Sequence, residues 1–387
     1  MRRTACLVPI LTLAAGSTLL SATAAHSATA ASATPPASTV SATVSATDTE
    51  PVEKEAADTG AEQRSVRRYW TEAKMAAAKP LDAVAPGKGG VRLTAAAAGT
   101  RASETRLSGA RLSGTQASGM RLSGTRASGA QPSAAPVSVP ATSPGGEAAT
   151  TVKAPAASRA STGAPWTRSG AIVKTVGRVF FTYQGRNASC SGNAVTSGNK
   201  STVITAGHCV RMGGAFHTNW VFVPGYDNGD RPYGTWVATT LYTTPQWNNS
   251  EDVDYDVAAA VVAPLNSRSL TDVVGGQGVS FNQARRQQMH SFGYPAAYPY
   301  DGSKLVYCSG RTFDDFMMSH DIGLDCDMTG GSSGGPWFSR FDERTGLGTL
   351  NSVNSFKYGS AGGWMFGPYF GTDAQAVYDA AQDTGAP

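Results

Sequence analysis

Aromatic residues are almost missing from the first 165 residues of this 387-residue chain. The sequence contains 13 Phe, 7 Trp and 13 Tyr, and only Tyr69 and Trp70 precede Trp166. A segment with so few large apolar side chains cannot bury enough surface to offset the conformational entropy of folding. The composition therefore excludes a large core in residues 29–165 and predicts a mostly disordered, low-complexity segment there.

A long apolar run is also missing. The longest, Ala5–Leu20, is shorter than the roughly 20 residues that a membrane-spanning helix needs. Basic residues precede this run and small residues follow it, which is the pattern of a secretory signal peptide. We expect residues 1–28 to be a leader that is removed near Ala24 or Ala28. The sequence thus predicts a secreted, extracellular protein with no membrane partner.

No charge of one sign dominates the chain, whose 32 Lys+Arg and 28 Asp+Glu give a formal net charge of +4. The excess of positive charge lies in the first 165 residues. The part from Trp166 to the end, which could fold, carries 15 basic and 18 acidic residues. Since a nucleic-acid binder needs a basic folded surface, nucleic acid is not expected as a partner.

Cysteine is scarce. Cys6 belongs to the leader, which leaves Cys190, Cys209, Cys308 and Cys326. An even number in an exported chain predicts two disulfides, and four cysteines permit three pairings. We expect neighbours along the chain to pair. The alternative is four free thiols or a zinc site, but no pair has the Cys-x-x-Cys spacing of zinc ligands, and no metal is expected.

Within the low-complexity segment, residues 62–78 are rich in helix formers and include Tyr69, Trp70 and Met75. Their spacing predicts a helix with one apolar stripe that ends before Lys79-Pro80. An isolated helix of this length is marginal in water, so it would dock on another part of the protein. The alternative is a transient helix in a disordered segment.

A five-residue period, with units such as Arg-Leu-Ser-Gly-Thr, runs through residues 101–135. It resembles the pentapeptide repeats of a quadrilateral β-helix. At four units per coil it supplies fewer than two coils, whereas a solenoid needs about three stacked repeats. A flexible, basic linker is therefore the favoured interpretation.

From Trp166 onward, short β-type runs are separated by Gly, Asn, Asp and Pro. The runs are 171–183, 201–205, 220–223, 235–243, 257–262, 289–292, 304–307, 347–356 and 364–370. Many short strands without intervening helices predict an antiparallel sandwich or barrel, and only Asp373–Asp383 is typical of a helix. The loop 227–230 is interpreted as a turn rather than a calcium site.

Two local patterns supply candidate polar groups. His208, in Thr-Ala-Gly-His-Cys, follows an apolar strand; a lone histidine is more often structural, but the adjacent cysteine would fix its backbone. Asp256 leads directly into an apolar run, so its carboxylate is expected to be buried and must then be paired. The nearby Asp254, Asp252 and Glu251 are interpreted as a solvated turn.

A third pattern is the glycine-rich stretch Gly330–Trp337, Gly-Gly-Ser-Ser-Gly-Gly-Pro-Trp. It could be a flexible loop, or a nucleophile loop in which glycines let backbone N–H groups converge on an oxyanion. Both Ser332 and Ser333 fit the Gly-x-Ser-x-Gly pattern of α/β-hydrolases. That fold places its histidine after the serine, and no histidine follows His320.

The order His208, Asp256, Ser333 is the chymotrypsin order. With the motifs Thr-Ala-Gly-His-Cys and Gly-Ser-Ser-Gly-Gly-Pro, the stretch 174–381 resembles the secreted bacterial trypsin-like serine peptidases of the chymotrypsin fold, in the broad group that includes glutamyl endopeptidases. The resemblance implies a fold and a set of boundaries. These are an all-β domain at 166–387 with two antiparallel six-stranded barrels, at 171–262 and 268–371, and a short C-terminal helix.

The resemblance also implies a role for each residue of the motifs. Ser333 would be the nucleophile, His208 its base and Asp256 the residue that orients the histidine. Backbone N–H groups of Gly331 and Ser333 would form the oxyanion hole, and Cys190–Cys209 would brace the histidine loop. Ser332 stands where trypsin-type enzymes have an acid, so activation by insertion of a charged N-terminus is not expected.

The same resemblance assigns Ser355, Phe356 and Lys357 to the strand that pairs with substrate. Asp327, six residues before the serine, would select basic residues, whereas Lys357 argues for the opposite preference. Residues 29–165 would be a pro-region, and the partners would be protein or peptide substrates and this pro-region. No cofactor is implied, and a monomer is expected.

Two alternative functions fit the same scaffold. One is an inactive exported binding protein, with its basic repeats attached to an anionic cell wall, because a fold alone does not guarantee an activity. The other is an esterase that uses the same three residues.

Overall fold

The computed structural model describes residues 50–84, 134–149, 160–359 and 363–386. All of them belong to one compact unit. The predicted leader and nearly all of the five-residue repeats lie outside the described residues. Within the described part, every helix is too short or too polar to cross a membrane.

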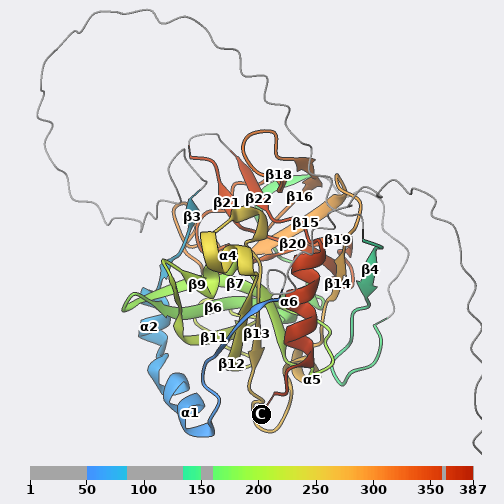
Figure 1. Cartoon of the computed structure of the whole chain (residues 1–387). Coiled ribbons are helices and arrows are strands. Elements are labelled where there is room, and N and C mark those ends of the chain that lie inside the picture. Colours follow the sequence, from blue (N-terminus) through green and yellow to red (C-terminus); the bar gives the residue numbers. More distant parts are fainter. Residues whose placement is uncertain (1–49, 85–133, 150–159, 360–362, 387) are drawn as a thin grey trace, which may run out of the picture. The chain divides into compact units, whose positions relative to one another are not determined.

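Six antiparallel strands in the first half of the β-rich region close into a barrel (Figure 1). They are β6 (Val176–Tyr183), β7 (Arg186–Ala194), β8 (Thr202–Thr205), β11 (Thr218–Pro224), β12 (Trp236–Thr243) and β13 (Ala258–Val262). The order is β12-β11-β6-β7-β8-β13, and β13 pairs back with β12. A small hairpin, β9 (Arg211–Met212) and β10 (Ala215–Phe216), lies beside it. The predicted first barrel is confirmed.

The second half is built from two further sheets. The larger has the order β4-β14-β20-β19-β15-β16-β5, with strands β4 (Val137–Val139), β5 (Ser161–Pro165), β14 (Gly278–Phe281), β15 (Gln288–Gly293), β16 (Val306–Arg311), β19 (Pro336–Asp342) and β20 (Leu347–Val353). The smaller has the order β17-β18-β22-β21-β3, with strands β3 (Ala83–Val84), β17 (Phe313–Asp314), β18 (Ile322–Asp325), β21 (Phe356–Lys357) and β22 (Trp364–Gly367). In the described residues, the strands of this half thus form two separate hydrogen-bonded sheets.

Helices are few and short in the β-rich region. They are α3 (Ile172–Thr175), α4 (Pro245–Ser250), α5 (Leu270–Val274), α6 (Thr372–Asp383) and the 3₁₀ turns η2 (Gly207–Cys209) and η3 (Val253–Tyr255). The C-terminal helix α6 forms where the sequence predicts one, and it packs against β12 and β13. Its Tyr378 is buried and donates a hydrogen bond to the carbonyl of Thr196 at 2.7 Å.

The sequence predicts a mostly disordered segment over residues 29–165 with a possible helix at 62–78, but the described pieces of this segment also contain strands that it did not predict. Strand β1 (Val52–Glu55) extends the first barrel at β12, while β4 pairs with β14 and β5 pairs with β16. Unpaired strand edges offer backbone hydrogen bonds to any extended segment, even one without a core of its own. Composition cannot reveal this kind of order. These strands place folded structure before the predicted boundary at Trp166.

The helix predicted over 62–78 is two helices, α1 (Gly60–Tyr69) and α2 (Glu72–Ala77). The break follows Trp70, because Thr71 caps the second helix by accepting a hydrogen bond from the N–H of Lys74. Trp70 is only 1% exposed, its Nε1 donates to the carbonyl of Asn219 at 2.6 Å, and its ring lies 5.6 Å from that of Phe180. The helical segment therefore docks on the first barrel. A short strand, β2 (Lys79–Pro80), follows it.

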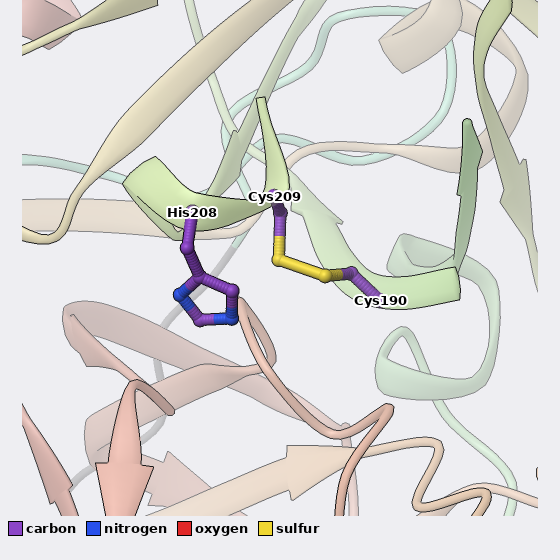
Figure 2. A group of neighbouring side chains, drawn as sticks. All are labelled: Cys190, His208 and Cys209. Carbon is purple, nitrogen blue, oxygen red and sulfur yellow. A yellow bond between two sulfur atoms is a disulfide. The ribbon is translucent and has the colours of Figure 1, made fainter. Parts of the chain in front are cut away.

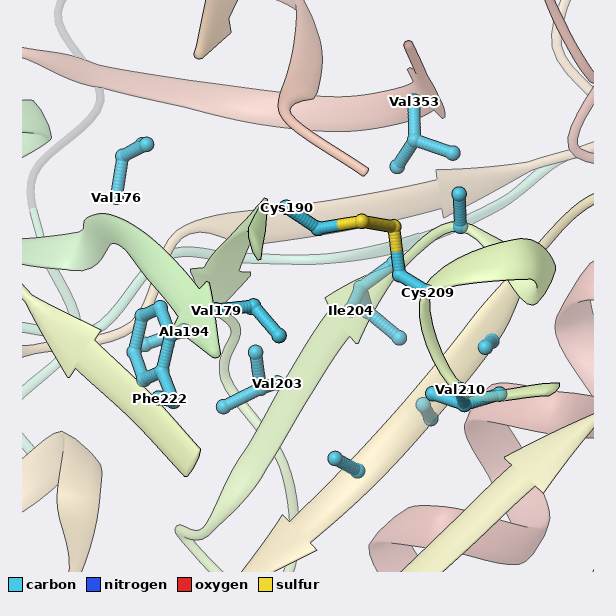
Figure 3. Packing of buried hydrophobic residues seen from close by; sticks show 14 of the residues in the cluster. Val176, Val179, Cys190, Ala194, Val203, Ile204, Cys209, Val210, Phe222 and Val353 are labelled. Carbon is cyan, nitrogen blue, oxygen red and sulfur yellow. A yellow bond between two sulfur atoms is a disulfide. The ribbon is translucent and has the colours of Figure 1, made fainter. Parts of the chain in front are cut away.

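Two disulfides link neighbouring cysteines, as the sequence predicts. Cys190 on β7 is bonded to Cys209 on η2, and Cys308 is bonded to Cys326. Figure 3 shows the first bond among apolar side chains of the barrel, with Val353 of the second half nearby. This disulfide therefore ties the turn that carries His208 to a core strand.

Replacing Cys190 and Cys209 together by alanine should lower the free energy of unfolding. The two cysteines are 19 residues apart, and opening a loop of that size costs about 3 kcal/mol in the chain-entropy account. Urea unfolding of the wild type and the double variant measures the difference. The matched control is Cys308→Ala with Cys326→Ala, whose separation of 18 predicts a similar loss. A loss below about 1 kcal/mol in both would contradict this estimate.

Candidate active site

The pairing of β8 with β13 brings His208 and Asp256 together. In this antiparallel pair Thr205, the last residue of β8, lies opposite Ala258, the first residue of β13. The turn η2 directly follows one strand end and η3 directly precedes the other. Residues 48 apart in sequence thus meet at one end of the barrel.

Asp256 holds His208 by two hydrogen bonds. The backbone N–H of His208 donates to Oδ1 at 2.8 Å, and its Nδ1 lies 2.8 Å from Oδ2. Ser355, from the second half, also donates its Oγ–H to Oδ2. Both His208 and Asp256 are fully buried, so the carboxylate requires these donors. Because an ionised carboxylate only accepts, Nδ1 carries the proton and Nε2 is left as an acceptor.

In the described part of the chain, the Nε2 atom of His208 is buried and has no hydrogen-bond partner. The loop that carries Ser333 lies beside the histidine turn. A Cβ atom added to Gly334 would lie 2.0 Å from Oγ1 of Thr205 and 2.8 Å from the backbone nitrogen of Ala206. The serine loop thus packs against the end of β8, next to the turn that carries His208.

Gly331 and Gly334 require the backbone freedom of glycine. Their φ angles are +93° and +76°, in the left-handed region that most side chains avoid. A Cβ atom on Gly331 would also lie 2.9 Å from the carbonyl oxygen of Tyr294. These glycines therefore allow the turn around Ser333 that the sequence pattern predicts.

Two backbone N–H groups at the serine are unengaged. Among the residues that the structure describes, the N–H groups of Gly331 and Ser333 donate to no carbonyl or side chain. These are the two groups that the sequence predicts for the oxyanion hole. Ser332 instead points its hydroxyl to the carbonyl of Thr329 at 2.8 Å and is 1% exposed.

Sequence reasoning missed two residues that hold this loop. Ser191 on β7 donates its N–H to the Ser333 carbonyl at 2.7 Å and its hydroxyl to the Gly331 carbonyl at 2.9 Å. Asn354 is fully buried; its Nδ2 donates to the Ser332 and Phe292 carbonyls, both at 3.0 Å. Its Oδ1 accepts from Ser291 and Trp337. Such contacts join distant segments, and neither residue lies in a motif.

Cys190, His208 and Cys209 are close enough to suggest a metal site, since their ligand atoms lie within 4.8 Å of one another. Figure 2 shows that the two sulfur atoms are bonded to each other. A disulfide offers no thiolate ligands. The three residues therefore form a braced histidine turn rather than a zinc site.

The predicted specificity residues are only partly brought together. Asp327 is exposed rather than enclosed, and its carboxylate accepts a hydrogen bond from Tyr300 at 2.7 Å. Lys357 is half-buried, and burial lowers the pKa of its amine against the opposing charges of Asp327 and Asp82. Phe356 is buried with its ring stacked on Phe366 at 5.4 Å.

A second histidine–aspartate pair resembles the first. Asp254 accepts from the backbone N–H of His320 at 2.7 Å and lies 2.8 Å from its Nδ1. The side chain of His320 is 88% exposed, so this pair faces solvent, unlike His208 and Asp256. Both residues line a cavity of about 650 Å³ with Arg285. Burial raises the pKa of the nearby Asp321 carboxyl.

Residue 217 is a further buried histidine that the sequence patterns did not reveal. Its Nε2 donates to the carbonyl of His208 at 2.9 Å, and its ring stacks on Phe181 at 4.3 Å. The hydrogen bond from His217 therefore helps to hold the turn that carries His208. Burial lowers the pKa of His217 to about 3, so it is neutral in the folded protein.

Comparisons with known proteins give three informative matches, although no protein-family model matches the chain. Protease Anisep from Arthrobacter nicotinovorans is 49% identical, with a TM-score of 0.53, and the match covers 56% of this chain and 99% of that structure. The thermostable serine protease AL20 from an extremophilic microorganism is 41% identical, with a TM-score of 0.53, over 56% of this chain and 100% of that one. The Extracellular metalloprotease of Bacillus subtilis (strain 168) is 37% identical over 71 residues, which span 18% of this chain and 22% of that protein.

Because His217 is neutral in the folded protein, the free energy of unfolding should decrease as the pH is lowered. An unfolded histidine titrates near 6.5, so between about pH 6.5 and 3 the unfolded chain binds a proton that the folded chain does not. Acidification should therefore lower the free energy of unfolding, by up to about 1.4 kcal/mol per pH unit from this residue. Urea unfolding from pH 6.5 to 4.5 measures the slope, which should be shallower in His217→Gln. Equal slopes in the two proteins would rule this explanation out.

Proposed function

The chain belongs to the bacterial serine peptidases of the chymotrypsin fold, and from this we propose that it is a secreted endopeptidase that hydrolyses protein or peptide substrates. The observation that carries the proposal is the buried Asp256–His208 pair, whose Nε2 has no hydrogen-bond partner, together with the packing of the Ser333 loop beside the histidine turn. The two disulfides, which persist in oxidising compartments, support an extracellular setting.

In the proposed reaction Ser333 Oγ attacks the carbonyl carbon of the scissile bond. His208 Nε2 accepts the hydroxyl proton as the new C–O bond forms. The tetrahedral intermediate then breaks its C–N bond, and His208 returns the proton to the leaving amine. Water repeats the sequence on the acyl-enzyme: the same nitrogen takes its proton, the ester bond breaks, and Ser333 recovers its hydrogen.

Asp256 keeps this base in the useful tautomer. Its hydrogen bond to Nδ1–H leaves Nε2 as the acceptor and stabilises the imidazolium that forms. The additional hydrogen bond from Ser355 fixes the position of the carboxylate. Asp256 therefore acts through His208 without exchanging a proton itself.

The N–H groups of Gly331 and Ser333 supply the oxyanion hole of the proposal. Both are free to donate, and losing one such donor typically costs on the order of 10²–10³ in turnover. Protein groups handle every proton and electron pair in this sequence of steps. The proposal therefore includes no metal or organic cofactor.

The residues before the peptidase domain act as a pro-region in this proposal. The part that the structure describes at 50–84 contacts the first barrel through β1, α1 and Trp70. Such a segment, removed after export, would keep the enzyme inactive inside the producing cell. The leader at residues 1–28 would direct that export.

A fluorophosphonate should form one covalent adduct on the purified, secreted protein. The adduct should disappear in Ser333→Ala and persist in Ser332→Ala, because the Ser332 hydroxyl is tied to the carbonyl of Thr329. Intact-mass spectrometry measures the adduct and also locates the mature N-terminus. Hydrolysis of casein by the same samples separates a peptidase from an esterase.

Three results would overturn this proposal. The first is the absence of any adduct on fully processed protein, which would favour an inactive binding scaffold. The second is labelling that requires Ser332 rather than Ser333. An adduct with cleavage of ester substrates alone would assign the same residues to an esterase.

A further inference from the structure

Residues 79–84, here called the strap, pass through the active site from one half of the peptidase to the other. On the first barrel Lys79 lies opposite Ala188 of β7, in a parallel pairing. On the second half Ala83 lies opposite Phe356 of β21, again in parallel. Between these pairings the N–H of Leu81 donates to the carbonyl of Ser189 at 3.1 Å.

The carbonyl oxygen of Leu81 accepts the hydrogen bond that Ser333, the proposed nucleophile, donates. Ser333 Oγ donates to this oxygen at 3.3 Å, so its proton points to the strap and not to Nε2 of His208. The N–H groups of Gly331 and Ser333 do not donate to the same oxygen. The Leu81 carbonyl is therefore not polarised by the oxyanion hole, and the proton of Ser333 is not directed to His208.

Asp82 fills the space beside the serine loop. A Cβ atom on Gly330 would lie 2.3 Å from both carboxylate oxygens of Asp82, so only glycine leaves room for this side chain. Burial raises the pKa of Asp82, while the charges of His208 and Lys357 act in the opposite direction. The strap thus places a carboxyl group within reach of the charges of both the proposed base and Lys357.

The direction of the strap is opposite to that of a productive substrate. His208 belongs to the first barrel and returns its proton to the leaving amine, so the residues after the scissile bond must lie on the first-barrel side. The acyl half, which precedes the bond, then lies toward β21. In the strap the order is reversed: its earlier residues pair with β7 and its later residues pair with β21.

We propose that the strap is an intramolecular inhibitor that binds backwards and is therefore not cut by the enzyme it blocks. This rests on the proposed function and adds the means of its regulation. Backbone pairing on both sides supplies affinity without a productive geometry at Leu81. Release requires removal of the segment by another peptidase molecule or loss of its docking on the first barrel.

The docking of the helices before the strap holds it in place. Tyr69 donates its hydroxyl to Asn187 Oδ1 at 2.7 Å, and the buried Trp70 donates to the carbonyl of Asn219. Met75 is also buried. Loss of the Trp70 side chain should loosen the whole segment and expose the site more often.

The test compares the rate of fluorophosphonate labelling in four full-length proteins. The wild type should react slowly, and Trp70→Ala and Leu81→Pro should react about 100-fold faster. Leu81→Pro removes the N–H that bonds to Ser189. Arg68→Ala is the matched control, because Arg68 lies on α1 two residues before Trp70 and is exposed, and it should react like the wild type.

Mass spectrometry of the wild type after long incubation tests the reversed direction. The bonds from Lys79 to Val84 should remain intact while cleavage occurs elsewhere. A dominant cut at Leu81–Asp82, or a wild type that labels as fast as Trp70→Ala, would overturn the proposal.

Hydrogen exchange separates a failure of the strap from a failure of the proposed chemistry. The Leu81 amide should exchange slowly in both the wild type and Ser333→Ala, and faster in Trp70→Ala. Protection at Leu81 with no labelling of any variant would refute the serine nucleophile and leave nothing for the strap to inhibit. Rapid exchange at Leu81 with normal labelling would refute the strap alone.

Discussion

The structure depends on one buried ion: the carboxylate of Asp256. Burial of such a charge is strongly unfavourable unless donors surround it, and here three donors do so. Two belong to His208 and the third, Ser355, comes from the second half of the domain. The halves must therefore meet correctly before the carboxylate is satisfied. The same contacts that stabilise Asp256 give the imidazole its tautomer, so folding and the proposed chemistry share one set of hydrogen bonds.

The serine loop is fixed by a second set of contacts between the halves. Ser191, on the first barrel, binds the loop from one side, and Asn354 binds it from the other through a fully occupied amide. Glycines at 331 and 334 provide the backbone angles. These contacts involve no residue before 85, so the proposed inhibition does not require the segment to build the serine loop.

The family resemblance predicted the first barrel, whereas the short β-type runs alone left a sandwich or a barrel open. The helical pattern of Asp373–Asp383 and the even number of cysteines are local signals, and they predicted the C-terminal helix and the two disulfides. The sequence also selected Asp256 over Asp254 correctly as the buried carboxylate, since only Asp256 leads into an apolar strand. It could not predict Ser191, Asn354 or His217, whose roles depend on contacts between distant segments. The helical part of residues 50–84 was predicted, but the strands on either side of it were not, because they depend on the strand edges of the two halves.

The most direct test of the Asp256–His208 pair uses its solvent-facing counterpart as the control. Asp256→Asn and Asp254→Asn change the same atom in two similar histidine–aspartate pairs, one buried and one exposed. The measurement is kcat/KM on a peptide substrate, with both variants freed of the pro-region. A loss of about 10⁴-fold in Asp256→Asn with a change of less than about threefold in Asp254→Asn is predicted. Equal losses, or a loss below about tenfold in Asp256→Asn, would contradict the assignment of the base to His208.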